Sequence, residues 1–221
     1  MRGSTSWLLC ALFGLAWVSP ARAVIVPNGG SLSVSADANW TMGGQHQNDS
    51  PPPLILGGAY GPFSISASAL TGASSATVTL QTQRAPDSLL LTMSGRESSG
   101  GGQTATAQIT WRFIEIFSLT APATVQLTDV RNTDQHFSYG EFLRDVSDNH
   151  VITFDASGMA NLPTGQYRLE SLDMSTFVSN FGSGTMSHSV TLAIVPEPAA
   201  FAIATAPTVV LLVRRRRRLN R

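Results

Sequence analysis

The sequence predicts an all-β protein, a single antiparallel β-sandwich of jelly-roll-like type with eight to ten strands between residues 24 and 195. Three observations lead to this fold class. Apolar and hydroxyl-bearing side chains alternate with period two over residues 63–69, 76–80 and 124–128. Clusters of Gly and Pro separate such stretches. No window in this region shows a convincing helical period longer than about ten residues.

The stretch 109–119 is the most informative of the predicted strands. Ile109, Trp111 and Phe113 share one phase of the alternation, and Ile114 and Ile116 take the other. Either both faces of this strand are buried or a bulge near Phe113 resets the phase, and both alternatives place the strand centrally in its sheet. The shared phases predict a core made of Ile109, Trp111, Phe113, Val78, Leu80, Val125, Leu127, Leu192 and Ile194.

Turn residues delimit the other strands. Turns are predicted at 28–30 (Asn-Gly-Gly), 51–53 (Pro-Pro-Pro), 57–58, 85–87, 100–102 and 162–165. The stretch 134–149 contains Phe137, Phe142, Leu143 and Val146, a spacing that allows one short helix.

Charge is segregated along the chain although the formal net charge is zero. Every basic residue is Arg, and six of the fourteen lie in the last eight positions. Residues 24–195 hold six Arg against thirteen Asp and Glu, so this body is acidic. An acidic body is a poor partner for nucleic acid, which needs clustered basic side chains. Cys10 is the only cysteine and lies in the leader, which excludes thiol catalysis and thiolate metal sites in the body.

The first 23 residues have the three parts of a secretory signal peptide. Arg2 provides the positive start, and residues 7–18 form an uncharged, largely apolar run. This run would extend only about 18 Å as a helix, which is too short to span a bilayer. Small side chains at Ala21 and Ala23 follow, so signal peptidase is expected to cut between Ala23 and Val24.

The last 26 residues have an equally ordered composition. Pro196, Glu197 and Pro198 precede an apolar segment over 199–213, and a basic stub over 214–221 follows, beginning with Arg214, Arg215, Arg216, Arg217 and Arg218. Arg beside an apolar segment stays on the cytoplasmic side, so the body is expected outside the membrane.

This tail resembles the PEP-CTERM sorting signal of bacterial exported proteins, which membrane proteases of the exosortase family recognise. The resemblance covers residues 196–221 only. It implies that the protein is held transiently in the inner membrane, cleaved near the Pro-Glu-Pro triplet, and released to the cell surface or the extracellular matrix. A plain single-pass anchor is the alternative. Pro207 and the length of the segment, about 22 Å as a helix, make it a marginal span.

No catalytic, cofactor or metal motif is recognisable in the body, so no catalytic residue, cofactor or metal ligand is predicted. Glu115 is the best single carboxylate for catalysis, but an Arg-paired or solvated residue is the favoured interpretation. The acidic stretch 145–149 is interpreted as a solvated loop rather than a calcium site. The four histidines are expected in exposed loops. The aromatics that could form a sugar-stacking platform, although core positions are favoured, are Trp40, Trp111, Tyr60, Tyr139 and Tyr167.

These observations predict an exported, non-enzymatic cell-envelope or extracellular-matrix protein. Its expected partners are signal peptidase, an exosortase-type protease and the inner membrane, with no nucleic acid. A secreted carbohydrate-binding module that contacts extracellular polysaccharide is the first alternative. A glycan-active hydrolase, which needs two carboxylates facing each other in a cleft, is the second.

Overall fold

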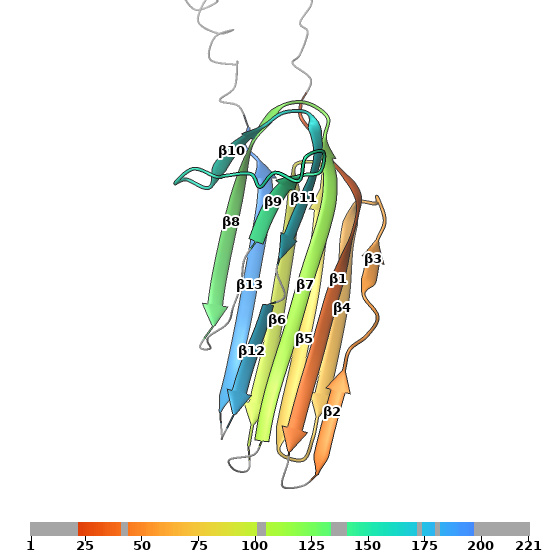
Figure 1. The fold of residues 1–221 in the computed structure, drawn as a ribbon, viewed down its shortest axis with the longest axis vertical. Coiled ribbons are helices and arrows are strands. Elements are labelled where there is room, and N and C mark those ends of the chain that lie inside the picture. The colour runs from red at the N-terminus through yellow and green to blue at the C-terminus, as the bar shows by residue number, and fades with distance from the viewer. Residues whose placement is uncertain are drawn as a thin grey trace, which may run out of the picture.

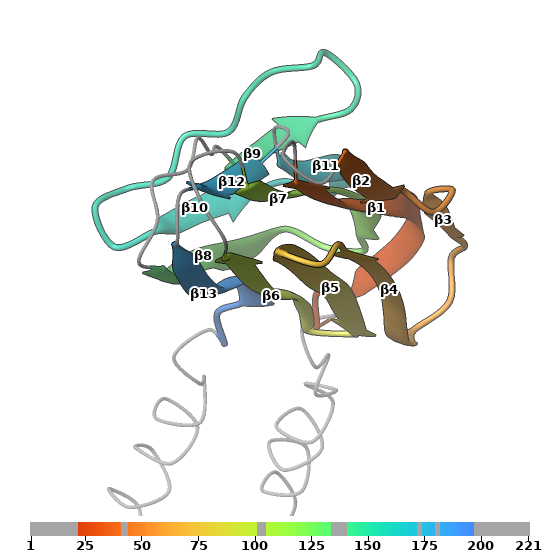
Figure 2. The ribbon, with the colours of Figure 1, turned by 90° about the horizontal axis from the view of Figure 1, so that it is seen from below.

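The computed structural model describes residues 22–40, 44–100, 105–133, 141–171, 174–179 and 182–196. In this part of the chain the fold is all-β: two antiparallel sheets pack face to face, so the predicted β-sandwich is confirmed (Figures 1 and 2). No helix in it is both long enough and apolar enough to cross a membrane. The predicted signal helix and membrane helix lie outside the described residues.

The two sheets are named A and B. Sheet A has the order β2 (Gln45–Asp49), β1 (Ile25–Trp40), β7 (Ala105–Leu119), β11 (Gly165–Ser171), β9 (Glu141–Asp145), with β3 (Leu54–Leu56) beside β1 and β12 (Met174–Ser179) beside β7. Sheet B has the order β10 (Met159–Leu162), β8 (Ala123–Thr133), β13 (Ser183–Ile194), β6 (Ser88–Ser99), β5 (Ser74–Ala85), β4 (Gly61–Leu70). The described residues thus contain thirteen strands rather than eight to ten, because short edge strands such as β2 and β3 carry little apolar alternation.

The strands run along the long axis of the molecule and define two poles (Figure 1). The terminal pole, at the top of Figure 1, contains Val24, Val195 and the turn between β5 and β6. The distal pole, at the bottom, contains the end of β1 at Trp40 and the segment 71–73 that joins β4 to β5. A strand of 16 residues such as β1 spans about 50 Å, so the poles are far apart.

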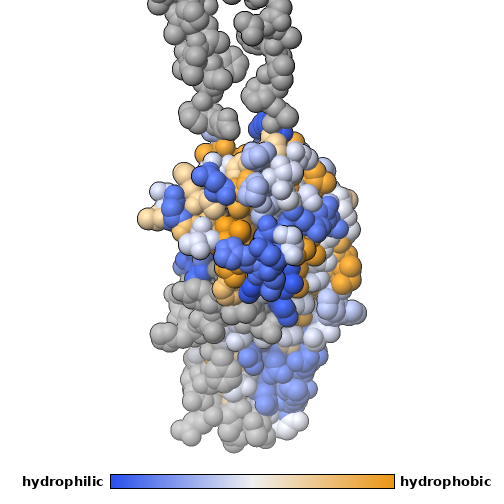
Figure 3. Space-filling model, turned by 45° about the horizontal axis from the view of Figure 1, so that its top comes forward, coloured by the Kyte–Doolittle hydropathy of each residue, from blue (hydrophilic) through white to orange (hydrophobic). Residues whose placement is uncertain are grey.

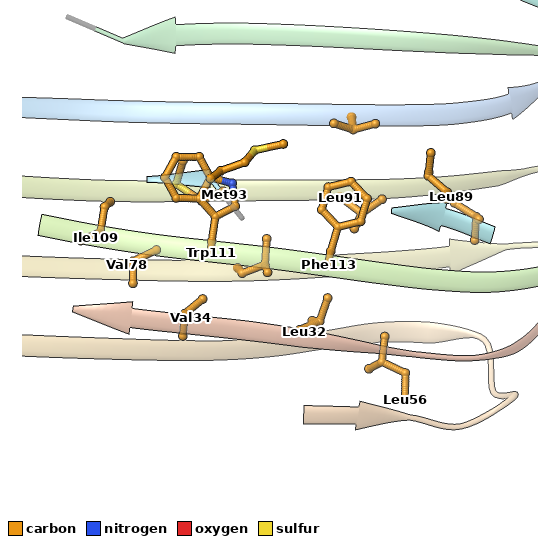
Figure 4. Packing of buried hydrophobic residues seen from close by; sticks show 14 of the residues in the cluster. Leu32, Val34, Leu56, Val78, Leu89, Leu91, Met93, Ile109, Trp111 and Phe113 are labelled. Carbon is orange, nitrogen blue, oxygen red and sulfur yellow. The ribbon is translucent and has the colours of Figure 1, made fainter. Parts of the chain in front are cut away.

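The core lies between the sheets and contains the residues predicted from the alternation (Figure 4). Seven of the nine predicted core residues are buried, and Leu127 and Ile194 are partly buried against the same cluster. Trp111 and Phe113 are 1% exposed and point from β7 toward Met93 and Leu91 of β6, as Figure 4 shows. Interdigitation of large side chains from both sheets is what excludes water from such a sandwich.

Strand β7 is central in sheet A, as predicted, with β1 on one side and β11 and β12 on the other. Its odd-numbered residues face the core without interruption, so no bulge resets the phase at Phe113. Glu115 occupies a core position, which is why the apolar pattern broke there in the sequence. Ile114 and Ile116 lie half-buried on the opposite face. Of the two alternatives, burial on both faces therefore agrees better with the structure than a bulge.

The predicted turn at Asn28-Gly29-Gly30 is wrong, because these residues lie inside β1. The register against β7 shifts between Pro27 and Gly29, which marks a β-bulge. Gly30 has φ of +151°, and a Cβ there would lie 2.1 Å from the Ile114 carbonyl oxygen. Glycine is therefore required by the close approach of two backbones and not by a chain reversal.

The predicted short helix over 134–149 is also wrong where the structure describes it. Residues Glu141–Asp145 form β9, which pairs with β11, and residues 146–148 form a turn. Leu143 packs in the core, whereas the neighbouring Phe142 lies on the other face. The pattern is that of a short strand followed by a turn, which has too few periods to be told from a helix in the sequence.

A side-chain ladder closes one edge of the sandwich. Carboxylate or amide oxygens of Asp49, Gln47 and Gln45 on β2 accept hydrogen bonds from the backbone N–H groups of Ser68, Leu70 and Gly72, at 2.7, 2.8 and 3.0 Å. The free N–H row at the edge of β4 is thereby covered by polar side chains of the other sheet. Covering an edge in this way limits pairing with a foreign strand.

Candidate functional site

The beginning and the end of the body lie together at the terminal pole. The Ile25 N–H donates to the Pro86 carbonyl (2.8 Å), and the Ile194 N–H donates to the Asp87 carbonyl (2.9 Å). Two adjacent residues of one turn therefore hold both ends. Val24, the expected first residue after signal cleavage, is further fixed by a mutual pair of hydrogen bonds with Thr120. The two segments predicted to carry addresses thus leave the same pole.

Only a few residues of the predicted signal-cleavage site and sorting tail belong to the described part of the chain. Ala23 and Val24 are half-buried, and Pro196 is exposed directly after β13. Ala21, Glu197 and Pro198, the apolar segment, and the retention residues Arg214 to Arg218 lie outside the described residues. Figure 3 shows the terminal pole and the side of sheet A, where strongly hydrophilic patches lie between hydrophobic ones.

Glu115 is enclosed in the core and paired with Arg84, so the favoured Arg-paired interpretation is confirmed. The Arg84 Nε and Nη2 groups donate to Glu115 Oε2 at 2.9 and 2.6 Å, and the Thr82 hydroxyl donates to Oε1 at 2.8 Å. The Arg84 and Glu115 side chains are 0% and 1% exposed. Burial raises the pKa of Glu115, and the Arg84 guanidinium and the Thr82 hydroxyl oppose that rise.

The remaining donors of Arg84 bind backbone carbonyls. Nη1 donates to Gly57 and Ala59, and Nη2 also donates to Gly29 in the β1 bulge. The guanidinium carbon lies 5.1 Å from the centroid of the Phe63 ring. Every N–H of this guanidinium is therefore used, and Glu115 has no opening to a substrate. The pair joins β5 of sheet B to β7 of sheet A, which is a structural role.

Glu97 is a second core carboxylate, but it has only one polar partner side chain. It is 0% exposed, and its Oε1 accepts a 2.7 Å hydrogen bond from the Thr176 hydroxyl of β12. Its Oε2 atom has no hydrogen-bond partner among the described residues. Its cross-strand neighbours, Ala76 and Gly184, offer none. Burial raises the pKa of Glu97 to about 7, and the hydroxyl of Thr176 and the backbone of Ile109 oppose that rise.

Of the four histidines, His136 lies outside the described residues, and the other three lie in three different environments. His150 is an exposed loop residue, as expected. His46 is exposed as expected, but it lies on strand β2 rather than in a loop, with Nε2 2.7 Å from the Asp37 carboxylate. The expectation for His188 is wrong, because it is 3% exposed on β13, with Nε2 2.9 Å from the Asp129 carboxylate. In the described part of the chain no group of three or more His, Cys, Asp or Glu side chains could hold a metal ion.

The loop after β9 is held by its own carboxylates. Asp145 Oδ1 accepts hydrogen bonds from the Ser147 N–H and hydroxyl at 2.8 and 2.7 Å, and Asp148 accepts one from the His150 N–H. These bonds lower the pKa of Asp145. Both carboxylates form turn hydrogen bonds within this acidic loop.

The aromatic side chains do not gather on one surface of the described chain. Trp111 and Tyr167 are buried, and the Tyr167 hydroxyl donates to the Pro163 carbonyl four residues upstream, as in the tyrosine corner of other sandwiches. Tyr60 is 44% exposed and donates to the Ile25 carbonyl near the terminal pole. Trp40 borders a shallow hollow at the distal pole, and Tyr139 lies outside the described residues.

Sequence reasoning missed the charged residues of the core other than Glu115. Arg84 shares the phase of Val78 and Leu80, and Glu97 shares the phase of Leu91 and Met93. The sequence signal for these residues is a charged side chain that shares the alternation phase of the apolar core residues on the same strand. Comparison with known proteins yields no matching family model, no matching curated protein and no matching solved structure.

Proposed function

We propose that the chain is an exported, non-enzymatic cell-envelope or extracellular-matrix protein, held at the membrane by residues 196–221 and released by an exosortase-type protease. The proposal includes a signal helix within residues 1–23, a membrane helix over 199–213 and a jelly-roll-like path of the body. The observation that carries it is the order of residues 196–221, a Pro-Glu-Pro triplet, an apolar segment and an Arg run. The turn at Pro86 and Asp87 adds that both ends of the body lie at one pole. A tail leaving there would present the distal pole and both outer sheet faces away from the membrane.

Two further features support a non-enzymatic role over the hydrolase alternative. Glu115, the best carboxylate candidate, forms a buried ion pair with Arg84, and Glu97 is fully buried. Neither can act as an acid or a nucleophile toward a bound sugar, because catalysis requires direct reach to the glycosidic bond. The carbohydrate-binding alternative loses Trp111 and Tyr167 as stacking residues, since both lie in the core.

The test is replacement of Pro196, Glu197 and Pro198 by alanine in a host that carries an exosortase. The unmodified protein is expected outside the cell, and the variant is expected in the membrane fraction at full mass. The matched control replaces the loop residues Pro51, Pro52 and Pro53 by alanine, and it should leave release unchanged. If the unmodified protein also stays in the membrane with its Arg run intact, the sorting proposal is wrong and the plain anchor is correct.

A further inference from the structure

The outer face of sheet B differs in chemistry from the rest of this acidic body. The name hydroxyl face is used here for the outward-pointing residues of β4, β5, β6 and β13. Most of these residues are Ser or Thr, and Arg96 is the only charged one. The carboxylates of these four strands and their joining turns lie elsewhere: Glu97 points into the core, and Asp87 lies in the terminal turn. The face is therefore close to neutral.

The side chains of the hydroxyl face are aligned across the strands. Direct cross-strand pairs join Ser66 to Thr79, Thr79 to Ser94, and Ser94 to Ser187, which gives one row of hydroxyls across four strands. A second row, one pleat repeat closer to the terminal pole, consists of Ser64, Gln81, Thr92 and Ser189. Pleated-sheet geometry places such groups on a grid of roughly 4.8 by 6.8 Å.

These polar groups are not used within the described part of the molecule. None of the eight side chains in the two rows donates or accepts a hydrogen bond there. The outer face of sheet A is different. Asp37 is bound by His46 and Asn48, and Glu170 is bound by Arg144 and Arg168. The charged groups on the outer face of sheet A are therefore paired within the fold, and the hydroxyls beside them, such as Ser35 and Thr110, hold no hydrogen bond among the described residues either. The hydroxyl face of sheet B differs in being nearly free of charge and in extending its hydroxyl row over four strands.

The shape of the hydroxyl face suits an extended ligand. In Figure 2 no coloured element lies over the outer side of β4, β5, β6 and β13, whereas the loop around β9 and β10 extends beyond sheet A. The short side chains of Ser and Thr lose little rotamer freedom when they bind, and the sheet fixes their backbone. Such a surface donates and accepts many hydrogen bonds without a charge or an aromatic ring.

We infer that the hydroxyl face binds a neutral polysaccharide, laid along the sheet and held by hydroxyl-to-hydroxyl hydrogen bonds. A neutral glycan is favoured over an anionic one because the face offers one cation, Arg96, while the body as a whole carries a negative charge. This inference rests on the proposed function in one respect, since a matrix location brings the protein to such a polymer. It specifies the partner class and the surface.

The test uses the protein expressed from the full-length sequence in its host and recovered from the medium, or from the membrane fraction when it is not released, with cellulose and dextran as neutral probes and alginate as the anionic probe. The variant of the row, S66A/T79V/S94A/S187A, removes four hydroxyls. The matched control, S31A/S35A/T110V/S175A, removes four hydroxyls from the outer face of sheet A. Cosedimentation with cellulose and affinity electrophoresis in dextran measure binding, and thermal unfolding checks that both variants are folded.

The unmodified chain and the control are expected to bind at least one neutral probe more tightly than alginate. The row variant should bind at least about tenfold more weakly, because several hydrogen bonds are lost together. Equal loss in both variants, or no binding of either neutral probe, would overturn the inference. Self-association that only the row variant abolishes would also overturn it and assign the face to a second copy. Failure of release with intact binding would instead refute the sorting proposal alone.

Discussion

Two carboxylates occupy core positions of this sandwich, and they are held in different ways. Glu115 receives two N–H groups of Arg84 and the Thr82 hydroxyl, whereas Glu97 receives the Thr176 hydroxyl at one oxygen only. A buried carboxylate without a cationic partner is costly when ionised and is more stable when protonated. The two residues therefore affect stability differently as the pH changes.

Glu97 is expected to make the fold less stable as the pH rises. Its pKa is about 7 in the folded protein against an ordinary value of 4.5, so the folded state retains a proton that the unfolded state loses. Stability should fall between pH 4.5 and 7 and level off above that, by an amount on the order of 3 kcal/mol. Urea unfolding across this range measures it.

The substitution Glu97→Gln should remove the decline in the free energy of unfolding between pH 4.5 and 7, because the amide does not titrate. Thr176→Val should act in the opposite sense: with the donor to Oε1 gone, the pKa rises further and the decline extends to higher pH. A pH profile for Glu97→Gln identical to that of the unmodified protein would show that Glu97 does not titrate with folding.

Trp111 is the largest fully buried side chain, and its removal should be costly. Trp111→Ala should destabilise the protein by about 3–5 kcal/mol, because the cavity cannot be filled by the neighbouring strands. The adjacent outward-facing change Thr110→Val should stay within about 0.5 kcal/mol in the same urea titration. A loss below about 1 kcal/mol for Trp111→Ala would place the ring near the surface and contradict the packing.

At the scale of elements, the ladder between β2 and β4 substitutes for a hydrogen-bonded strand pair. Gln47 and Asp49 accept from the Leu70 and Ser68 N–H groups, so Q47A/D49A should leave those two amides open to water. Hydrogen exchange at Ser68 and Leu70 should accelerate by roughly a factor of ten per lost bond. The comparison variant Q81A/Q83A, on the outer face of β5, should leave hydrogen exchange at Ser68 and Leu70 unchanged. Unchanged protection in Q47A/D49A would mean that the ladder does not close this edge.

The sequence predicts strands well where one face is continuously apolar and poorly where polar or charged residues interrupt that face. The alternation over 76–80 and 109–113 correctly located β5, β7 and their core residues. Strand β2 (Gln45–Asp49) has no apolar phase, because its side chains bind the edge of β4. Glu115 interrupts the apolar alternation of β7 at a core position. Its partner Arg84 lies 31 residues away in the sequence, so the pairing could not be read from neighbouring residues. Such long-range pairings leave little trace in one sequence.

At the scale of the whole molecule, the body can be described as a rod with two different ends and two different faces. The terminal pole gathers Val24, Pro196 and the turn that holds both ends. Sheet A carries internally paired charges on its outer face, and sheet B carries unpaired hydroxyls. The clustering of both ends at one pole could not be predicted from sequence, because it depends on the pairing of β1 with β7 and of β13 with β6.

The intact mass of the protein recovered outside its host tests the central claim, that both terminal segments are addresses removed from an exported sandwich. The account predicts one species that begins at Val24 and ends near Ala199, without the apolar segment and Arg214 to Arg218. A start a few residues from Val24 would correct only the cleavage site. A chain that begins at Met1, or one found only in membranes with its arginines attached, would contradict the account.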